Sequence, residues 1–436
     1  MTTSFNTNDY AIYLPAVNDT FAGILTKPLA KQRQFPQNLS VDDLAFWRSG
    51  NPLFHHPYIL HSVGLHPVGS RIDNAITRTP RNSRILVGDS GGYQIGKGKL
   101  VGLKSLKQAM PADAAVNAWD EADDVRSWIV NWLETNCQYA MTLDMPLWAV
   151  TEAGESSPFH RCSVSQLTAM SVDNLRYIDI HRQGDAKWLN VIQGIDEQTT
   201  NEWFQAVKWF KQGGWALAGA AGVRGGLELL LKAVLMMRDE GAFEEGQDWL
   251  HVLGTSSVHW AITLTTIQRC LRKTNPKLTV SYDSSSPFQI GGRYERLCLT
   301  PKFGENYGDW NIGYVQSPQG EKYVGSSEAF PASSPLGDQI TLGDLNIYEQ
   351  KYRKRRYDSL SLAMLSHHNT FIYLQSFDKA NEIVFNETKK SQIPKFICEY
   401  VACIENAFDR SDWYSYLMKN QLLLSRHSKS RYKPSD

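Results

Sequence analysis

Short apolar runs recur along the chain up to residue 282, and stretches with helical periodicity separate them. Seven of these runs have the length of buried strands, at residues 57–63, 84–87, 138–143, 187–192, 214–218, 249–253 and 278–282. Between them, segments such as 122–135 and 227–237 repeat apolar side chains at the spacing of an amphipathic helix. Strands that alternate with helices form a parallel sheet, and this many units predicts an α/β fold closed into a (β/α)8 TIM barrel, with one strand still unidentified.

The pattern changes beyond residue 283. Residues 301–335 are rich in Gly, Ser, Pro and aromatic residues with little periodicity, which predicts a long loop or insertion. From residue 348 onward helical periodicity returns, and the chain ends in a basic tail. The predicted helices cover residues 352–377, 395–408 and 413–424, and the tail covers 426–433. We therefore expect a barrel domain over residues 1–345, with an insertion near 301–335, and a helical C-terminal extension over 346–436.

Composition narrows the class of protein without selecting a function. The chain has 436 residues, 42% of them hydrophobic, and a formal net charge of zero. The N-terminus lacks the basic start and apolar core of a signal peptide, and no apolar run approaches the ~20 residues of a membrane helix. We therefore expect a cytoplasmic protein without a membrane partner. The six cysteines form no close CxxC pair, which favours free thiols over a disulfide framework or a zinc ribbon.

Two aspartates stand where apolar runs end. Asp89 follows the run at 84–87, and Asp283 follows the run at 278–282 and precedes three serines. A parallel barrel places its chemistry at the C-terminal ends of its strands, and two carboxylates there permit acid/base catalysis beside covalent catalysis. An aspartate at a strand end also caps helices and forms turns, so a purely structural role stays open for both residues.

The string Gly88-Asp-Ser-Gly-Gly92 has two further interpretations. In a chymotrypsin-like protease Ser90 would be the nucleophile, but the histidine, the aspartate and two β-barrels do not fit into the residues before it. As a phosphate loop, residues 91–97 match G-x-x-x-x-G-K, but Gly98 stands where Ser or Thr must bind magnesium. Both interpretations account for one string only.

A wider set of motifs supports a third interpretation. Six motifs follow one another at predicted strand ends: Asp89-Ser-Gly-Gly-Tyr-Gln94, Thr142-Leu-Asp144-Met-Pro146, Val191-Ile-Gln193-Gly194, Ala218-Gly219-Ala-Ala-Gly222, His251-Val-Leu-Gly254 and Tyr282-Asp283. In this order they resemble the motifs of the tRNA-guanine transglycosylase superfamily. The resemblance covers about residues 57–287 and returns near His368. It implies a TIM-barrel pentosyltransferase that exchanges a guanine base on a nucleic acid.

The resemblance also implies a role for individual residues. Asp283 matches the nucleophile that attacks the anomeric carbon of the sugar, and Asp89 matches the acid/base that moves protons on the leaving and incoming bases. The purine needs a stacking face and polar groups at its edge. The matched substrate-binding positions are Ser90, Tyr93, Asp144, Gln193, Gly219 and Leu253. Tyr93 would stack on the base. Structural roles stay open for Asp144, before Pro146, and for Gln193.

One departure from the family concerns its zinc site. The tRNA enzymes carry a CxCxxC cluster that a histidine on a C-terminal helix completes. Here the helix motif survives as Leu365-Ser-His-His368-Asn369, while the cysteine cluster is missing. His368 and the lone Cys298 cannot build a tetrahedral site by themselves. We therefore expect no metal and no cofactor, and interpret His367 and His368 as packing or hydrogen-bonding residues.

A second departure concerns the nucleic acid. The arginine-bearing stretch that follows the nucleophile in the tRNA enzymes is replaced by residues 284–294. The chain is thereby more similar to the branch, found in phages and bacterial DNA-modification clusters, that replaces guanine in DNA with a 7-deazaguanine such as 7-cyano-7-deazaguanine. Because guanine cannot be attacked inside a duplex, such an enzyme flips the base out or opens the strands.

The expected partners are DNA, the free 7-deazaguanine base and, as a possibility left open, a helper ATPase. With zero net charge the phosphate contacts would have to be local. The candidate nucleic-acid contacts are Arg293, Lys354, Arg355 and Arg356, with a second basic stretch at 425–433. A solvated helix face and a disordered tail are the alternatives for these two stretches. Two alternative functions remain: the same exchange on tRNA, and a non-catalytic nucleic-acid-binding barrel subunit.

Overall fold

A computed structural model describes residues 5–28, 35–36, 38–100, 105–244, 246–349, 354–386 and 393–429. Its centre is an all-parallel sheet of eight strands in the order β1-β8-β7-β6-β5-β4-β3-β2. The strands are β1 (Ile12–Pro15), β2 (Tyr58–Ser62), β3 (Ile85–Asp89), β4 (Tyr139–Met141), β5 (Lys187–Ile192), β6 (Gly214–Leu217), β7 (Trp249–Val252) and β8 (Thr279–Ser284). The (β/α)8 barrel predicted from the alternating pattern is confirmed.

Strand β1 is the one that the sequence pattern did not identify. It pairs in parallel with β8, and Leu14 lies opposite Asp283. On its other side the backbone N–H of Val17 donates to the carbonyl of Leu60 at 2.9 Å, and Ala16 bridges to Leu60 in parallel. The first strand therefore joins the two ends of the sheet and closes the ring.

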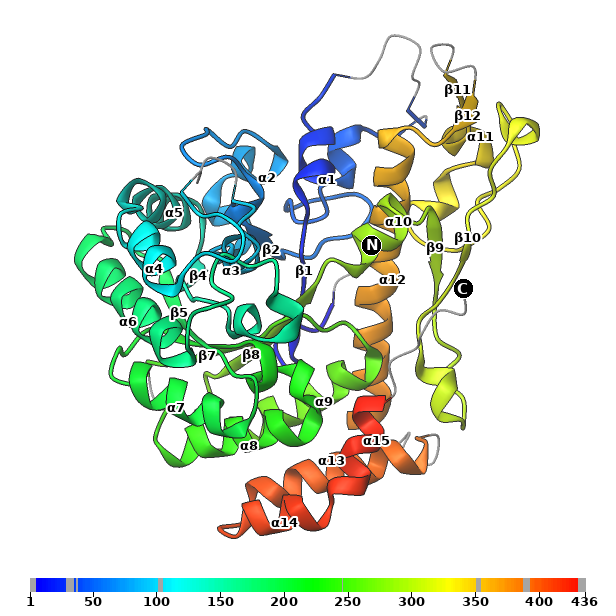
Figure 1. Cartoon of the computed structure of the whole chain (residues 1–436). Helices are drawn as coiled ribbons and strands as arrows, with labels where there is room; N and C mark the ends of the chain where they lie inside the picture. Colours follow the sequence, from blue (N-terminus) through cyan, green and yellow to red (C-terminus); the bar gives the residue numbers. More distant parts are fainter. Residues whose placement is uncertain are drawn as a thin grey trace.

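Helices surround the sheet in Figure 1. Those of the barrel are α1 (Asp19–Ile24), α2 (Ala75–Arg78), α3 (Gly92–Gly96), α4 (Ala112–Asp120), α5 (Asp123–Asn136), α6 (Val164–His181), α7 (Glu197–Val207), α8 (Gly226–Asp239), α9 (Val258–Leu271) and α10 (Ser286–Gly292). Local chemistry sets where they start: the Ser163 hydroxyl accepts from the N–H of Gln166 at α6, and Asp196 accepts from the N–H of Thr199 at α7. Side-chain acceptors of this kind satisfy N–H groups that the first turn leaves free.

Two apolar layers follow from the alternation of side chains along each strand. Inward-facing side chains, among them Leu14, Leu60, Val87 and Met141, fill the interior of the ring. Outward-facing side chains pack against the helices in a second, larger core. The interior is therefore a packed core, and His251 and Ser281 are polar side chains within it.

The chain beyond the barrel adds two antiparallel strand pairs and five further helices among the described residues. The pairs are β9 (Arg296–Leu299) with β10 (Gly313–Gln316), and β11 (Ile347–Glu349) with β12 (Lys354–Arg356). The helices are α11 (Leu342–Leu345), α12 (Ser359–Phe385), α13 (Lys395–Phe408), α14 (Trp413–Lys419) and α15 (Gln421–Lys429). In Figure 1, α12 runs along the side of the barrel and α13 to α15 gather at one end. Contacts of α12 with α9 and α10, and of α13 with α9, join this region to the barrel.

The segment 301–335, predicted as a long loop or insertion, contains strand β10, in which Tyr314 pairs with Cys298 in a hairpin. Two predicted boundaries are wrong. The helix predicted from residue 352 begins at Ser359, where Asp358 caps it, and the residues before it form β12. The basic stretch at 426–433 is not a tail throughout, since α15 extends to Lys429 and buried His427 bonds Thr263 on α9 at 2.8 Å. Residues 430–433 lie outside the described part of the chain.

All six cysteines lie in the described part of the chain and are free. None of the described helices combines the length and the apolarity that crossing a membrane requires. The proposed division into a barrel and a helical subdomain at residue 345 stays a prediction.

Gly88, next to Asp89 on β3, provides a test of the packing behind the strand. A methyl group at this position would overlap the Leu133 side chain and lie 2.5 Å from the sulfur of Cys137. We expect Gly88→Ala to lower the free energy of unfolding by about 1–3 kcal/mol, because well-packed cores do not absorb an extra methyl group without strain. Urea denaturation followed by circular dichroism measures the change.

The matched control is Gly23→Ala in α1, where nothing lies within 4 Å of the added methyl group. This variant should be neutral or more stable, since alanine favours the helical backbone over glycine by up to about 1 kcal/mol. Equal stability of the two variants would show that the side chains packed between β3 and α5 rearrange without cost to accept the added methyl group.

Candidate active site

The predicted site residues come from neighbouring strand ends on one face of the barrel. Asp89 is the last residue of β3, and Asp283 lies near the end of β8. The remaining positions follow the other strands: Asp144 after β4, Gln193 after β5, Gly219 after β6 and Leu253 after β7. Because all eight strands run in parallel, these ends open on the same face of the ring.

Asp283 is held by two donors on one oxygen. Its Oδ1 accepts from the backbone N–H of Gly254 at 3.0 Å and lies 3.2 Å from Nε2 of His251. The side chain is 14% exposed. Among the described residues no hydrogen bond to Oδ2 is found, so the second oxygen is left for a ligand at the mouth of the barrel.

A chain of hydrogen bonds determines how His251 faces Asp283. The indole N–H of Trp249 donates to the hydroxyl of Ser281 at 2.7 Å, and that hydroxyl lies 2.9 Å from Nδ1 of His251. Since the indole can only donate, the serine proton is free to go to Nδ1. The remaining ring proton then sits on Nε2 and points at the carboxylate of Asp283.

Sequence analysis assigned no role to His251, although it stands in one of the motifs. His251 could have been identified from the alternation of side chains along a strand, in which every second residue faces the same side. Trp249 and His251 on β7 face the interior, as do Ser281 and Asp283 on β8, and His251 is the register partner of Ser281. Only the pairing of β7 with β8 reveals that these four side chains form one network.

Asp89 is set at the other side of the mouth. Its Oδ1 accepts from the N–H of Gly91 at 3.2 Å. Burial raises the pKa of the Asp89 carboxyl above its ordinary value, and the negative charge of Asp283 raises it further. A carboxyl group with a raised pKa is suited to give and take a proton. Both carboxylates stand at strand ends on the same face of the ring, with β1 and β2 between them.

Asp144 is the most strongly perturbed group of the site. It is buried, and burial raises the pKa of its carboxyl to about 7, against the opposing effect of a hydrogen bond from Gln193. The amide nitrogen of Gln193 donates to Oδ2 of Asp144 at 2.6 Å. A methyl group on Gly92 would lie 3.1 Å from Oδ1. Asp144 and Gln193 therefore form a joined polar pair directly beside the loop of Asp89.

Tyr93 presents an aromatic face to solvent. It lies on α3 and is 57% exposed, and its ring centroid is 5.7 Å from that of Trp148, at an interplanar angle of 41°. The ammonium group of Lys97 lies 4.6 Å from the Trp148 ring. Sequence analysis did not select Trp148. An exposed ring of this kind provides a surface on which a planar base can stack.

The other predicted pocket residues have mainly supporting positions. Ser90 is fully buried, and its hydroxyl donates to the carbonyl of Thr142 at 3.1 Å, which ties the β3 and β4 ends together. Gly219 has φ +62°, and a methyl group there would overlap the Gly194 carbonyl, so only glycine fits. Leu253 is half-buried and packs on the interior of the ring.

The C-terminal histidines have the packing and hydrogen-bonding roles expected of them. Nε2 of His368 lies 3.1 Å from the backbone carbonyl of Cys298, and Nδ1 lies 2.9 Å from the Ser334 hydroxyl. Burial lowers the pKa of His368 to about 4. His367 is buried against the ring of Phe54, with centroids 4.7 Å apart.

The candidate nucleic-acid contacts are described only in part. Arg293 ends α10 on the surface, and its guanidinium carbon lies 5.4 Å from the ring centroid of Tyr294. Lys354, Arg355 and Arg356 form strand β12, and their side chains lie outside the described part of the structure. Their role in binding stays a prediction.

Comparison of the chain with protein-family models and with curated proteins found no match. A functional assignment therefore depends on the geometry of the barrel mouth and on the resemblance of its motifs.

The raised pKa of Asp144 predicts a pH-dependent stability. An aspartate has a pKa of about 3.9 in an unfolded chain, and burial in the fold raises that of Asp144 to about 7. The folded protein therefore binds more protons between these values, so its stability falls as the pH rises from about 4 to about 7. We therefore expect the difference in free energy of unfolding between Asp144→Asn and the parent protein to shift in favour of Asp144→Asn by more than about 1 kcal/mol when the pH is raised from 5 to 8.

Urea denaturation at pH 5 and pH 8 measures this difference. The same substitution at exposed Asp173 on α6 controls for the general effect of removing one negative charge. A pH-independent difference between Asp144→Asn and the parent protein would contradict the raised pKa.

Proposed function

We propose that this protein is a base-exchanging transglycosylase that replaces guanine in DNA with a 7-deazaguanine, such as 7-cyano-7-deazaguanine, through a covalent intermediate on Asp283. The observation that carries the proposal is the carboxylate of Asp283, held through Oδ1 by His251 and Gly254 at the barrel mouth. Asp89, with its raised pKa, shares the site. This is the pair of carboxylates that a double displacement at an anomeric carbon requires.

The first displacement uses both groups. Oδ2 of Asp283 attacks C1′ of the deoxyribose, and the bond between C1′ and N9 of guanine breaks with its electron pair going to the base. Asp89 in its protonated form gives the proton that the departing guanine needs, and becomes a carboxylate. Burial, which raises the pKa of Asp89, favours the protonated form at this step.

The second displacement reverses the roles. The Asp89 carboxylate takes the N9 proton of the incoming 7-deazaguanine, and that nitrogen attacks C1′. The bond between C1′ and Asp283 breaks, its electrons return to the carboxylate, and the exchanged DNA leaves. The sugar passes through two inversions, so its configuration is retained, and no net proton is consumed.

The Asp144–Gln193 pair beside Asp89 suits both the outgoing and the incoming base, because the two bases share one hydrogen-bonding edge. Guanine presents N–H donors and a carbonyl acceptor along one edge, and a 7-deazaguanine keeps that edge. Asp144 offers carboxyl oxygens, and Gln193 offers an amide with both a donor and an acceptor. Tyr93 supplies the exposed stacking face. A pocket that reads only this edge accepts the outgoing and the incoming base in turn.

A polar cavity next to the nucleophile has room for the backbone of the nucleic acid. It has a volume of about 380 Å³, and its lining includes Gly254, whose N–H bonds Asp283. Thr255, Ser256, Ser257 and Arg224 line it as well. Hydroxyls and a guanidinium are common phosphate contacts, which supports a polymeric substrate.

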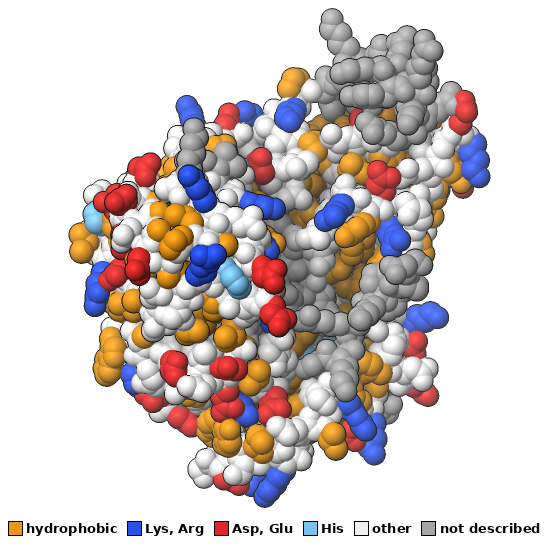
Figure 2. Space-filling view, in the orientation of Figure 1, with side chains coloured by type: hydrophobic (Ala, Val, Ile, Leu, Met, Phe, Trp, Pro, Cys, Tyr) orange, Lys and Arg blue, Asp and Glu red, His pale blue; other side chains and the backbone are white. Residues whose placement is uncertain are grey.

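The choice of DNA over tRNA depends on the residues after the nucleophile. Residues 284–294, which replace the arginine-bearing stretch of the tRNA enzymes, contain all of α10, and α10 packs against α12, with Gly291 against Ser366. On the face shown in Figure 2, the Lys and Arg side chains of the described residues are interspersed with Asp and Glu. Phosphate binding on this face would therefore be local, as proposed for the cavity beside Asp283.

Transfer of labelled base tests both the reaction and its substrate. The protein is incubated with radiolabelled 7-cyano-7-deazaguanine and, in separate reactions, with guanine-containing DNA or with tRNA. We expect the DNA to retain label, and Asp283→Ala to reduce incorporation by at least about 10³-fold, because a covalent path loses its nucleophile. The parent protein should also form a denaturant-resistant adduct with DNA.

Asp173→Ala, at an exposed position on α6, is the matched control and should leave incorporation unchanged. Label in tRNA alone would favour the tRNA alternative. Absence of label in both polymers, with nucleic acid still bound, would favour the non-catalytic subunit.

His251 is proposed to position the nucleophile. His251→Ala should lower kcat by about 10- to 100-fold, since a small misplacement of a reacting group costs this much. The KM for the free base should stay within about twofold, because His251 bonds Asp283 and not Asp144. His251→Gln, which keeps a donor, should recover part of the rate. A proportional loss of kcat and of folded protein in both variants would instead indicate a purely structural histidine.

A further inference from the structure

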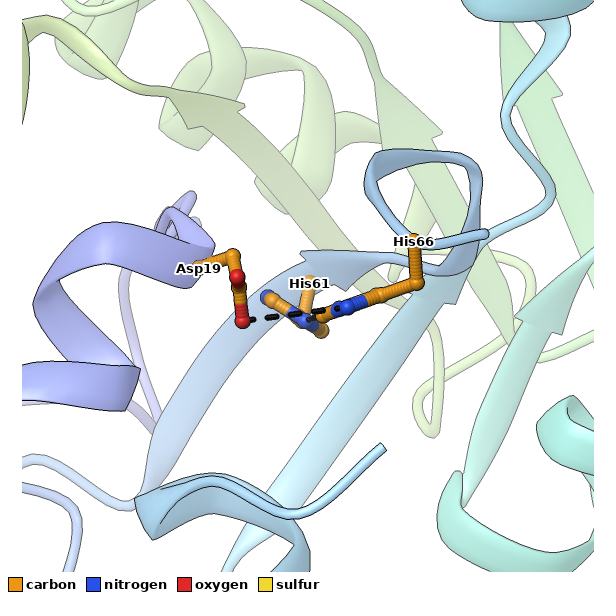
Figure 3. Close-up of side chains that lie close together, drawn as sticks. All are labelled: Asp19, His61 and His66. Atoms are coloured by element: carbon orange, nitrogen blue, oxygen red, sulfur yellow. Dashed lines mark hydrogen bonds and ion pairs between the residues drawn. The ribbon is translucent and has the colours of Figure 1, made fainter. Parts of the chain in front are cut away.

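Two buried histidines and an aspartate meet outside the ring of strands. Figure 3 shows Asp19, at the start of α1, beside His61 on β2 and His66, which follows the short 3-10 helix η2 (Val63–Leu65). One potential ligand atom from each residue lies within 4.8 Å of the others. His61 and His66 are buried, while Asp19 is exposed. None of these residues belongs to the proposed catalytic site.

The hydrogen bonds of His61 define its tautomer. Its Nδ1 lies 2.7 Å from the backbone carbonyl of Val17, which can only accept, so the ring proton is on Nδ1. In the neutral ring the other nitrogen, Nε2, then carries a free lone pair. This is the arrangement of a metal-binding histidine, in which the N–H that faces away from the metal commonly donates to a backbone carbonyl.

His66 stands between His61 and Asp19. Its Nε2 lies 2.9 Å from Nε2 of His61, and in the neutral ring the proton of His66 lies between these two atoms. Its Nδ1 then has a lone pair and lies 3.7 Å from Oδ1 of Asp19, an oxygen that also accepts from the Asn74 amide at 3.4 Å. A cation bound by both Nε2 lone pairs would instead place the His66 proton on Nδ1, from which it can donate to Asp19.

We propose that Asp19, His61 and His66 bind a divalent transition-metal ion, with Zn²⁺ as the best match. Imidazole nitrogens select ions of this class over Mg²⁺ and Ca²⁺, which prefer oxygen ligands. Zn–N bonds of about 2.0–2.1 Å place two tetrahedral nitrogens about 3.3 Å apart. The two nitrogens therefore need to separate by a few tenths of an ångström from the 2.9 Å observed, and the rings need to turn so that both lone pairs point at the ion. Asp19 is 51% exposed and held only by a long bond of 3.4 Å from the Asn74 amide, so a small rotation of its side chain can bring it to the ion.

The position of the proposed ion connects it to the loop of Asp89. The helix η2 lies between His61 and His66 in the chain. Its Gly64 packs closely against the backbone of Gly91: a methyl group added to Gly64 would lie 2.6 Å from the Cα atom of Gly91. The N–H of Gly91 bonds Asp89. An ion that joins α1, β2 and η2 therefore supports the backbone that holds this carboxylate.

This site differs from the zinc site of the family that the sequence resembles. It uses no cysteine, and it involves neither His368 nor Cys298. The missing cysteine cluster predicted a chain without metal, and that motif carries no information about Asp19, His61 and His66. The three residues of the present set are separated by 42 and 5 positions, and the fold brings them together.

Metal binding is tested on the full chain, prepared without a polyhistidine tag and stripped with a chelator. After equilibrium dialysis against micromolar Zn²⁺, mass spectrometry of the metal should find about one ion per chain. Asp19→Asn and His66→Gln should each weaken binding by at least about tenfold, which is the effect of losing a ligand or its supporting partner. Because Asp19 is exposed, Asp19→Asn tests the site without disturbing the core.

Two control variants identify where the metal binds. His181→Gln, at an exposed position at the end of α6, and His368→Gln on α12 should both keep full binding. Circular dichroism verifies that each variant is folded. The proposal is overturned if the parent chain binds no Zn²⁺ under these conditions, if Asp19→Asn and His66→Gln bind it as tightly as the parent, or if only His368→Gln loses it. None of these results depends on base exchange.

Discussion

Closure of the sheet by β1 is the constraint on which the site depends. In the sheet order, β8 and β3 stand near opposite ends, and Asp283 and Asp89 would lie far apart if the sheet were open. Strand β1 pairs with β8, and the residues that follow it bond Leu60 on β2. Around the closed ring only β1 and β2 separate the two carboxylates. Two partly buried carboxylates are thereby brought near each other, and the negative charge of Asp283 contributes to the raised pKa of Asp89.

Carboxyl groups at the mouth of the barrel lie in surroundings where burial disfavours their charged form and raises their pKa. Asp144 is the clearest case, because burial dominates and the hydrogen bond from Gln193 compensates only in part. Such a group lowers the stability of the fold at neutral pH, and active sites commonly carry this kind of cost. Close backbone approaches near Gly91 and Gly92 hold the loop of Asp89 in place despite this. The packed interior below provides the rigid support that a positioned nucleophile requires.

Much of the architecture could be predicted from local pattern. Seven strands followed from apolar runs, and the strand-end aspartates followed from the rule that a barrel places its chemistry at one face. The errors came where local signals are weak or mixed. Strand β1 has four residues and needs β8 and β2 as partners, so its sequence carries little information by itself. The basic residues 354–356 follow a helical pattern, but their backbone pairs with β11.

The sequence by itself determined the alternation of strands and helices, the positions of Asp89, Asp144 and Asp283, and the motifs that resemble a base-exchange family, because these depend on residues close together in the chain. Only the tertiary structure decided which side chains act together. His251 reaches Asp283 through the pairing of β7 with β8, and Asp19 comes near His61 and His66 where His61 bonds the Val17 carbonyl just before α1. Hydrogen-bond direction and tautomer are set by partners from distant segments, and no local periodicity encodes them.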